Sequence, residues 1–220
     1  MRSRRLVAAA LAATPAALGA QGPSLHPARG AAAPLSALPA DWKMRLDRDN
    51  LPADYHLSAT AGGLHVTTVR AAGIFYESRL TAAGRYRVDA TLTQTKAPAH
   101  PEAYGLFVGG SALETPRQDY LYFVVRGDGR YLVKHRAGDQ VHTLADWTAS
   151  PAVRAADAAG RATNALRIDV GRDSVRFFAN GTRVVGLRRA ASLRTDGVVG
   201  LRVNHALDVL VDGPKITPTR

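Results

Sequence analysis

Three residues whose side chains can exchange protons or bind metal ions stand in two loop-like segments of the chain. His100 and Glu102 precede a predicted strand, and His205 follows another one. Loops on rigid sandwiches often carry functional sites, and imidazole and carboxylate groups serve in acid–base chemistry or as ligands of a hard metal ion. If the two segments meet in space, His100, Glu102 and His205 are the candidates for catalysis. The alternative is ordinary loop polarity.

Other patterns of catalytic or metal-binding residues are missing from the sequence. The seven histidines include no pair two positions apart, the spacing that two metal ligands on one strand require. Ser111 lacks the Gly-x-Ser-x-Gly turn of a serine nucleophile. Asp47 and Asp49 are the one close acidic pair near a predicted loop, and no calcium-binding motif surrounds them. We therefore expect no metal and no cofactor; calcium stays possible without support from a motif.

The elements that must position these residues are strands. Residues 64–69 and 84–93 alternate apolar and polar side chains with period two, which is typical of half-buried antiparallel strands. Only residues 151–162 could hold a helical turn. Many short strands at close spacing indicate a sandwich or a barrel. The further predicted strands are 103–108, 119–126, 130–136, 141–145, 165–170, 174–179, 182–187, 198–204 and 207–211.

Two dipeptides predict tight hairpins, because both suit a type I′ turn with positive φ at both central residues. They are Asn180-Gly181 and Asp128-Gly129. The second turn pairs Gly127 with Arg130. It also explains the tripeptide Arg-Gly-Asp, residues 126–128, as part of a hairpin and not as a projecting adhesion loop.

This register predicts a sheet face that could bind a saccharide. Aromatic rings can stack on the C–H surfaces of a sugar, while hydroxyl and charged tips can bond its hydroxyls. The alternative is that these side chains cover the sandwich without a ligand. The predicted ligand-binding residues, all on one face of the hairpin, are Tyr120, Tyr122, Arg126, Tyr131 and His135.

The first twenty residues have the order of a secretory signal peptide: a start with Arg2, Arg4 and Arg5, a short apolar run, and small residues up to Ala20. The run falls short of the roughly 20 residues that a membrane-spanning helix needs. We expect an exported protein, periplasmic or secreted, with an Ala/Pro-rich linker over residues 21–40 and one domain over residues 41–220. The chain has no cysteine, which excludes a lipoprotein anchor, disulfides and thiolate metal sites.

The formal net charge of +11 favours anionic partners, but the arginines are scattered along the chain. Nucleic-acid-binding proteins concentrate their positive charge, so we expect no nucleic-acid partner. The expected partners are a saccharide or an extracellular protein.

Several segments in succession resemble the concanavalin A-like lectin/glucanase superfamily, and most of all its bacterial laminin-G-like and DUF1080-type domains. They are YGLFVGG (104–110), DYLYFVVRGDGRYLVKHRAG (119–138), NALRIDVGRDSVRFFANGTRVV (164–185) and GVVGLRVNHALDVLVDGPKI (197–216). The resemblance covers residues 64–216. It implies a jelly-roll β-sandwich of two packed antiparallel sheets, one of them concave.

The resemblance leaves three functions open. Glucanases of the superfamily carry a Glu-x-Asp-x-Glu strand, and none of the three glutamates, Glu77, Glu102 and Glu114, has an acidic residue two positions away. The leading expectation is therefore a domain that binds carbohydrate or another extracellular ligand without catalysis. DUF1080-type proteins include 3-keto-disaccharide hydrolases, so a hydrolase that uses His100, Glu102 and His205 is the second. A protein-interaction domain of laminin-G-like type is the third.

Overall fold

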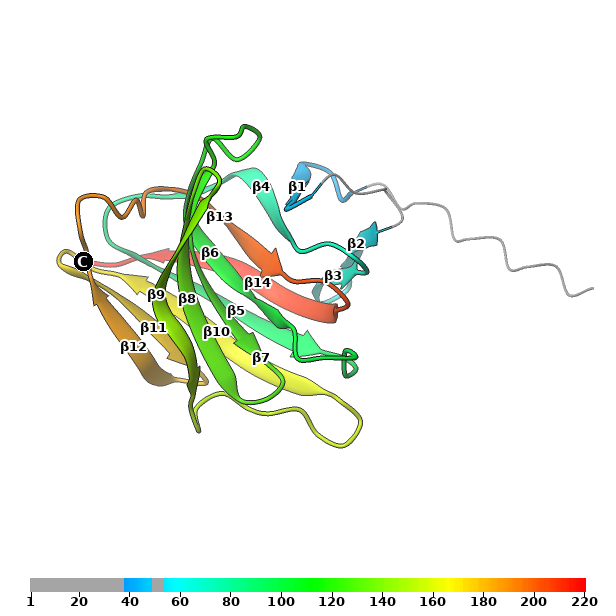
Figure 1. Ribbon diagram of the computed structural model, residues 1–220. Helices are drawn as coiled ribbons and strands as arrows, with labels where there is room; N and C mark the ends of the chain where they lie inside the picture. Colours follow the sequence, from blue (N-terminus) through cyan, green and yellow to red (C-terminus); the bar gives the residue numbers. More distant parts are fainter. Residues whose placement is uncertain (1–37, 49–53) are drawn as a thin grey trace, which may run out of the picture. The chain divides into compact units, whose positions relative to one another are not determined.

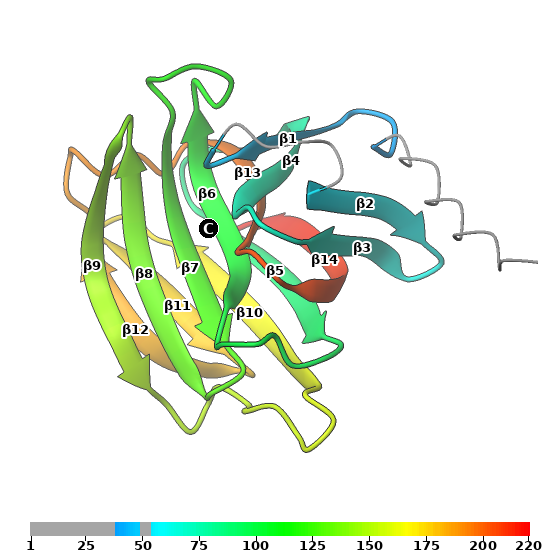
Figure 2. The same ribbon diagram turned by 45° about the vertical axis from the view of Figure 1, so that its right-hand side comes forward.

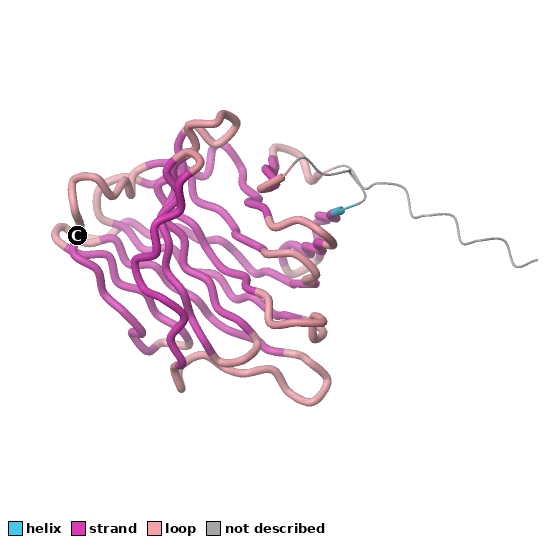
Figure 3. The backbone as a smooth tube through the Cα atoms, in the orientation of Figure 1, coloured by secondary structure: helices cyan, strands magenta, loops and turns pink. Residues whose placement is uncertain are grey.

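In the residues that the structure describes, the regular structure is almost entirely β-strand (Figure 3). The computed structural model describes residues 38–48 and 54–220. The predicted signal peptide and the linker up to residue 37 lie outside the described residues. In the part of the chain that is described, no helix is long and apolar enough to cross a membrane.

The strands of residues 38–48 and 54–220 form two seven-stranded antiparallel sheets (Figure 1). The first sheet runs in the order β1 (Trp42–Leu46), β4 (Gly73–Ala82), β13 (Gly197–Val203), β6 (Ala103–Ser111), β7 (Asp119–Arg126), β8 (Arg130–Ala137) and β9 (Gln140–Ala149). The second runs in the order β12 (Thr182–Arg188), β11 (Ser174–Ala179), β10 (Ala162–Val170), β5 (Tyr86–Gln94), β14 (Asp208–Pro218), β3 (Gly63–Thr68) and β2 (Tyr55–Thr60). Figure 2 shows β6 to β9 of the first sheet side by side. The predicted all-β jelly-roll sandwich is confirmed.

The main core lies between the two sheets. It is made by alternate side chains of facing strands, since successive residues of a strand point to opposite faces. The rings of Phe123 on β7 and Phe177 on β11 lie 5.4 Å apart across this core. Tyr131 on β8 reaches the opposite sheet, where its hydroxyl donates a hydrogen bond to the carbonyl oxygen of Val184 at 3.1 Å. Burial of this apolar surface is the main contribution to the stability of the sandwich.

A second apolar cluster covers the outer face of the first sheet. It contains Phe107 of β6 together with Tyr120 and Tyr122 of β7. Strand β6 is therefore buried on both faces, and its sequence AYGLFVGGS lacks the alternation of a half-exposed strand.

Two parts of the strand prediction need correction. Strands β1, β2 and β4 fall where the sequence predicted no separate strand. Residues 151–161 form turns and an irregular loop instead of a helical turn. The fully buried amide of Asn164 holds this loop, since its oxygen accepts a hydrogen bond from the backbone N–H of Arg154 at 2.8 Å and its nitrogen donates to the Arg154 carbonyl at 3.2 Å.

One of the two predicted hairpin turns is confirmed and the other has a different register. Asn180 and Gly181 have φ values of 49° and 83°, as the predicted turn requires. In the other hairpin Arg126, not Gly127, pairs with Arg130. The backbone N–H of Gly129, with φ of 79°, bonds to the carbonyl of Arg126, which makes a three-residue loop. A shift of one residue moves every side chain of β8 to the opposite face from the one predicted.

Candidate functional site

A row of four aromatic rings crosses the outer face of the first sheet. It consists of Tyr76 on β4, Phe107 on β6, and Tyr120 and Tyr122 on β7. The ring centroids of successive members lie 6.3, 5.3 and 5.6 Å apart. All four side chains are buried, so their faces are not open for stacking against a ligand.

Gly200 of β13 makes room for this aromatic row. A Cβ atom at this position would lie 2.5 Å from a ring carbon of Phe107 and 2.5 Å from the backbone oxygen of Phe75. The ring of Phe107 can therefore cross β13 only because residue 200 has no side chain.

A charged cover, formed by Asp47, Arg136 and Arg202, lies over one end of the aromatic row. The guanidinium of Arg202 donates to both carboxylate oxygens of Asp47, at 2.8 and 2.5 Å, and lies 5.5 Å from the ring centroid of Tyr122. It also donates to the hydroxyl of Tyr120 at 3.4 Å. Arg136 adds an ion pair to Asp47 at 3.5 Å. The Asp47 carboxylate thus holds two arginines over the aromatic row.

The electrostatics of the charged cover favour the ionised form of Asp47. Partial burial by itself raises the pKa of this carboxyl. The hydrogen bond from Arg202 and the charges of Arg202, Arg136 and Arg45 together lower the pKa by more than burial raises it, so the pKa lies below its usual value. Burial raises the pKa of the Tyr122 phenol, and this tyrosine stays neutral at physiological pH. Asp47 and Asp49 are the acidic pair that the sequence offered for calcium. Both carboxylate oxygens of Asp47 already accept hydrogen bonds from Arg202, and Asp49 lies outside the described residues.

A hollow of about 280 Å³ opens at the other end of the aromatic row, and we call this hollow the Tyr76 hollow. The loop after β6 forms one wall, and Arg45 fixes that loop by donating to the carbonyls of Leu113 and Thr115 at 2.8 and 2.6 Å. The residues around the hollow are Tyr76, Ser78, Gly110, Ser111, Ala112, Leu113, Glu114, Thr115 and Val198.

The hydroxyl of Tyr76 is the exceptional group of this hollow. The residue is 2% exposed, and its hydroxyl has no hydrogen-bond partner among the described residues. Burial and the nearby Glu114 carboxylate raise the pKa of the phenol, against a smaller opposite effect of Arg45. A buried hydroxyl without a partner costs about 1–3 kcal/mol, and a movement of the hollow's wall that admits a ligand hydroxyl or a water would recover this free energy.

The predicted ligand-binding residues divide between the two faces of the first sheet. Tyr120, Tyr122 and Arg126 lie on the outer face. Tyr131 and His135 lie on the inner face, because of the corrected hairpin register. The prediction that all five share one face is wrong.

The Arg-Gly-Asp tripeptide lies in the hairpin, and its two charges bind each other. Arg126 donates to both carboxylate oxygens of Asp128, at 2.9 and 2.5 Å, and its guanidinium lies 4.1 Å from the ring centroid of Trp147 on β9. Neither charge is free to project toward a receptor.

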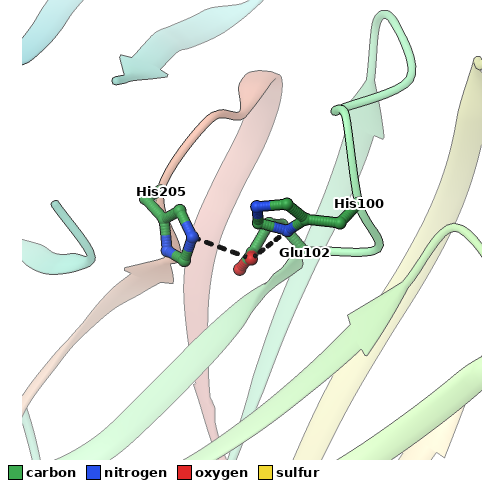
Figure 4. Close-up of side chains that lie close together, drawn as sticks. All are labelled: His100, Glu102 and His205. Atoms are coloured by element: carbon green, nitrogen blue, oxygen red, sulfur yellow. Dashed lines mark ion pairs between the residues drawn. The ribbon is translucent and has the colours of Figure 1, made fainter. Parts of the chain in front are cut away.

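His100, Glu102 and His205 do meet in space (Figure 4). One carboxylate oxygen of Glu102 lies 2.8 Å from Nδ1 of His100 and 3.0 Å from Nε2 of His205. The strand pairing explains the contact. Val203 of β13 pairs with Tyr104 of β6, so continuing this antiparallel register places His205 opposite Glu102.

Sequence reasoning considered Asp47, Ser111 and Glu114 for other roles but did not predict that residues of these segments form the Tyr76 hollow and the charged cover. Tyr76 lies in a segment where no strand was predicted, and Asp47 and Arg202 are 155 positions apart. The one local signal was Gly200: a glycine inside an apolar strand often marks the close approach of another group.

Comparison with known proteins supports the fold. No family model matches the sequence, and no curated protein matches it. Among solved structures, carbohydrate-binding module CBM66 from Bacillus subtilis is similar with a TM-score of 0.60 and 10% identity, over 80% of this chain and 94% of that one. A protein of unknown function with a galectin-like fold, from Bacillus subtilis, has a TM-score of 0.56 and 14% identity, over 81% of this chain and 89% of that one. A GH16 protein from Bacteroides ovatus, in complex with a product, has a TM-score of 0.56 and 7% identity, over 80% and 94%.

These likenesses define the class of the protein at the level of fold. The chain is a β-sandwich with the fold of the concanavalin A-like lectins and glucanases, as the sequence resemblance predicted.

Proposed function

We propose that the protein binds carbohydrate in the Tyr76 hollow without converting it chemically. The observation that carries this proposal is the buried Tyr76 hydroxyl, which lacks a partner among the described residues in a hollow also lined by Ser78, Ser111 and Glu114. Saccharides present many hydroxyl groups that both donate and accept hydrogen bonds, and such walls match them.

Further unpaired donors lie along the same sheet face. The Nε atoms of Arg136 and Arg202 are buried and have no partner among the described residues. With the Tyr76 hydroxyl, they are unpaired polar groups at both ends of the aromatic row, and a ligand reaches them only if the side chains above them move. The likeness to a carbohydrate-binding module and to a GH16 protein with bound product agrees with a ligand of this chemical class.

A glycan array followed by calorimetry tests the proposal. The full chain is probed with and without calcium, and the best saccharide is then titrated into Tyr76→Phe, which removes only the hydroxyl. Loss of one hydrogen bond predicts an affinity about 3- to 10-fold weaker. Tyr55→Phe, on β2 of the other sheet, is the matched control and should bind as the wild type does. No saccharide binding at all, or equal affinity in both variants, refutes the site.

We also propose that the protein is exported. The support is the order of basic, apolar and small residues over positions 1–20. Fractionation of producing cells and N-terminal sequencing of the purified protein test it. A mature chain that begins near Gln21, outside the cytoplasm, is the expected result; an intact leader on cytoplasmic protein contradicts the proposal.

A glycoside-processing hydrolase is the second candidate function, because the imidazoles of His100 and His205 both contact the same carboxylate oxygen of Glu102. Imidazole beside carboxylate can transfer protons in such a reaction. Incubation with 3-keto-disaccharides measures turnover directly. Turnover that is lost in both His100→Ala and Glu102→Gln, with saccharide binding intact, would favour this function over simple binding.

A further inference from the structure

The His100–Glu102–His205 cluster gathers three donors of the kind that bind metal ions. Nδ1 of His100, one carboxylate oxygen of Glu102 and Nε2 of His205 all lie within 4.8 Å of one another. In the described ranges, this is the one group of three such side chains with that proximity. The other histidine–carboxylate contacts, His65–Asp208 and His135–Asp119, involve one imidazole each.

The spacing of the donors is close to that of a bound zinc ion. Zinc–nitrogen and zinc–oxygen bonds of about 2.0–2.2 Å in a tetrahedron place neighbouring donor atoms roughly 3.3–3.6 Å apart. The two contacts to Glu102 are now 2.8 and 3.0 Å, the lengths of hydrogen bonds. Lengthening each of these two contacts by about half an ångström, after loss of the bridging proton, would give the zinc spacing. The two imidazole nitrogens lie within 4.8 Å of each other.

The backbone around the cluster is already fixed. The backbone N–H of Asn204 donates to the carbonyl of Ala103 at 2.8 Å, which extends the pairing of β13 with β6 to the cluster itself. Thr68 holds the other side of this loop: its hydroxyl donates to the Asn204 carbonyl and accepts from the N–H of Leu207 at 3.2 Å. These bonds fix the loop that carries His205 and the start of β6 next to Glu102, which limits the conformational freedom that these two donors lose when an ion binds.

The exposure of the three side chains leaves one direction open. The Glu102 side chain is 9% exposed and lies beneath the imidazoles of His100 and His205, which are 59% and 41% exposed. The two rings meet edge to face, with an interplanar angle of 60° and centroids 5.2 Å apart. An ion held from below by the carboxylate and from the sides by the rings would keep a coordination position toward solvent, as in sites with three protein ligands.

We propose that this cluster binds one divalent transition-metal ion of the zinc type. Two imidazole nitrogens and one carboxylate oxygen select such ions over calcium and magnesium, which take oxygen ligands only. The ion would join the β5–β6 loop to the β13–β14 loop. This site is separate from the Tyr76 hollow and does not depend on the proposed saccharide binding.

Calorimetric titration with zinc chloride tests the proposal. The full chain is prepared without a polyhistidine tag and treated with chelator, and calcium and magnesium chloride are titrated in parallel. One zinc ion should bind per chain, with no heat from calcium or magnesium. His100→Ala and His205→Ala should each weaken zinc binding at least about tenfold.

His142→Ala, an exposed histidine on β9, is the matched control and should leave zinc binding unchanged. Zinc binding that persists in the His100→Ala/His205→Ala double variant shows adventitious binding elsewhere and overturns the proposal, as does the absence of saturable 1:1 binding. Circular dichroism checks the fold of each variant. If Glu102→Gln fails to fold, the variants of the two exposed histidines, His100→Ala and His205→Ala, still test the site. As an independent readout, cobalt substitution should give visible absorption bands in the wild type that both histidine variants lose.

Discussion

Removal of the Asp47 carboxylate should destabilise the protein because it leaves the buried charge of Arg202 without its ion-pair partner. The Arg202 side chain is 6% exposed, whereas Asp47 is 27% exposed. Breaking a buried ion pair costs about 3–5 kcal/mol, because one charge remains uncompensated. Since Asp47 is partly open to water, we expect the lower end of this range, about 3 kcal/mol, for Asp47→Ala. Urea unfolding followed by circular dichroism, with an unchanged m-value, gives the free energy of unfolding.

A double-mutant cycle separates the orphaned charge from a lost contact. Arg202→Met removes the charge, so Asp47→Ala/Arg202→Met should be more stable than Asp47→Ala alone. Asp41→Asn, which breaks an exposed ion pair with Arg79, is the control and should cost less than about 0.5 kcal/mol. A cost below about 1 kcal/mol for Asp47→Ala, or a double variant as unstable as the sum of the singles, would refute the reasoning.

The same ion pair predicts the effect of acid. The folded protein lowers the pKa of Asp47 below its usual value, so the stabilisation by this carboxylate is complete above about pH 4 and is lost as the pH falls through the lowered value. The difference in free energy of unfolding between wild type and Asp47→Ala should be constant near neutral pH and shrink in acid. A difference that grows below pH 4 would contradict the direction of the pKa shift.

Three further substitutions test the packing. Gly200→Ala places a Cβ atom 2.5 Å from a ring carbon of Phe107 and 2.5 Å from the backbone oxygen of Phe75, and it should lower the free energy of unfolding in urea by at least about 2 kcal/mol. The control is Gly62→Ala, whose Cβ would have no atom within 4 Å and which should change the free energy of unfolding by less than about 0.5 kcal/mol. Asn164→Ala leaves the partly buried backbone groups of Arg154 without their side-chain partner and should lower the Tm by roughly 5–10 °C in calorimetry; an unchanged Tm would show that water replaces the amide. Arg126→Ala removes a cation over the ring of Trp147 and should cost about 0.5–1 kcal/mol and alter the tryptophan emission, and an unaltered spectrum would argue against the stacking.

The sequence predicted the sandwich well because its evidence is local. Alternation along single strands and the Asn180-Gly181 turn both depend on a few neighbouring residues, and the structure confirms both. The Asp128-Gly129 hairpin shows the limit of such evidence. A glycine after the aspartate is compatible with a two-residue loop and with a three-residue loop. The structure has the three-residue loop, in which Arg126 donates to both carboxylate oxygens of Asp128.

The candidate sites depend on contacts between distant segments, which one sequence does not specify. His100 and Glu102 lie two positions apart and could be grouped by spacing. His205 joins them only through the pairing of β13 with β6, and Asp47 meets Arg202 across 155 positions. Neither pairing leaves a periodic or compositional signal along the chain.

The placement of β13 and β14 has a consequence for the order of folding. These last strands lie inside the sheets: β13 separates β4 from β6, and β14 separates β5 from β3. Without β14, the second sheet would be two fragments, one of four strands and one of two. The early strands therefore cannot complete their native pairing until more than a hundred later residues have been synthesised. Pairings across such long sequence separations fold slowly, so the growing chain exposes unpaired strand edges until its last strands arrive.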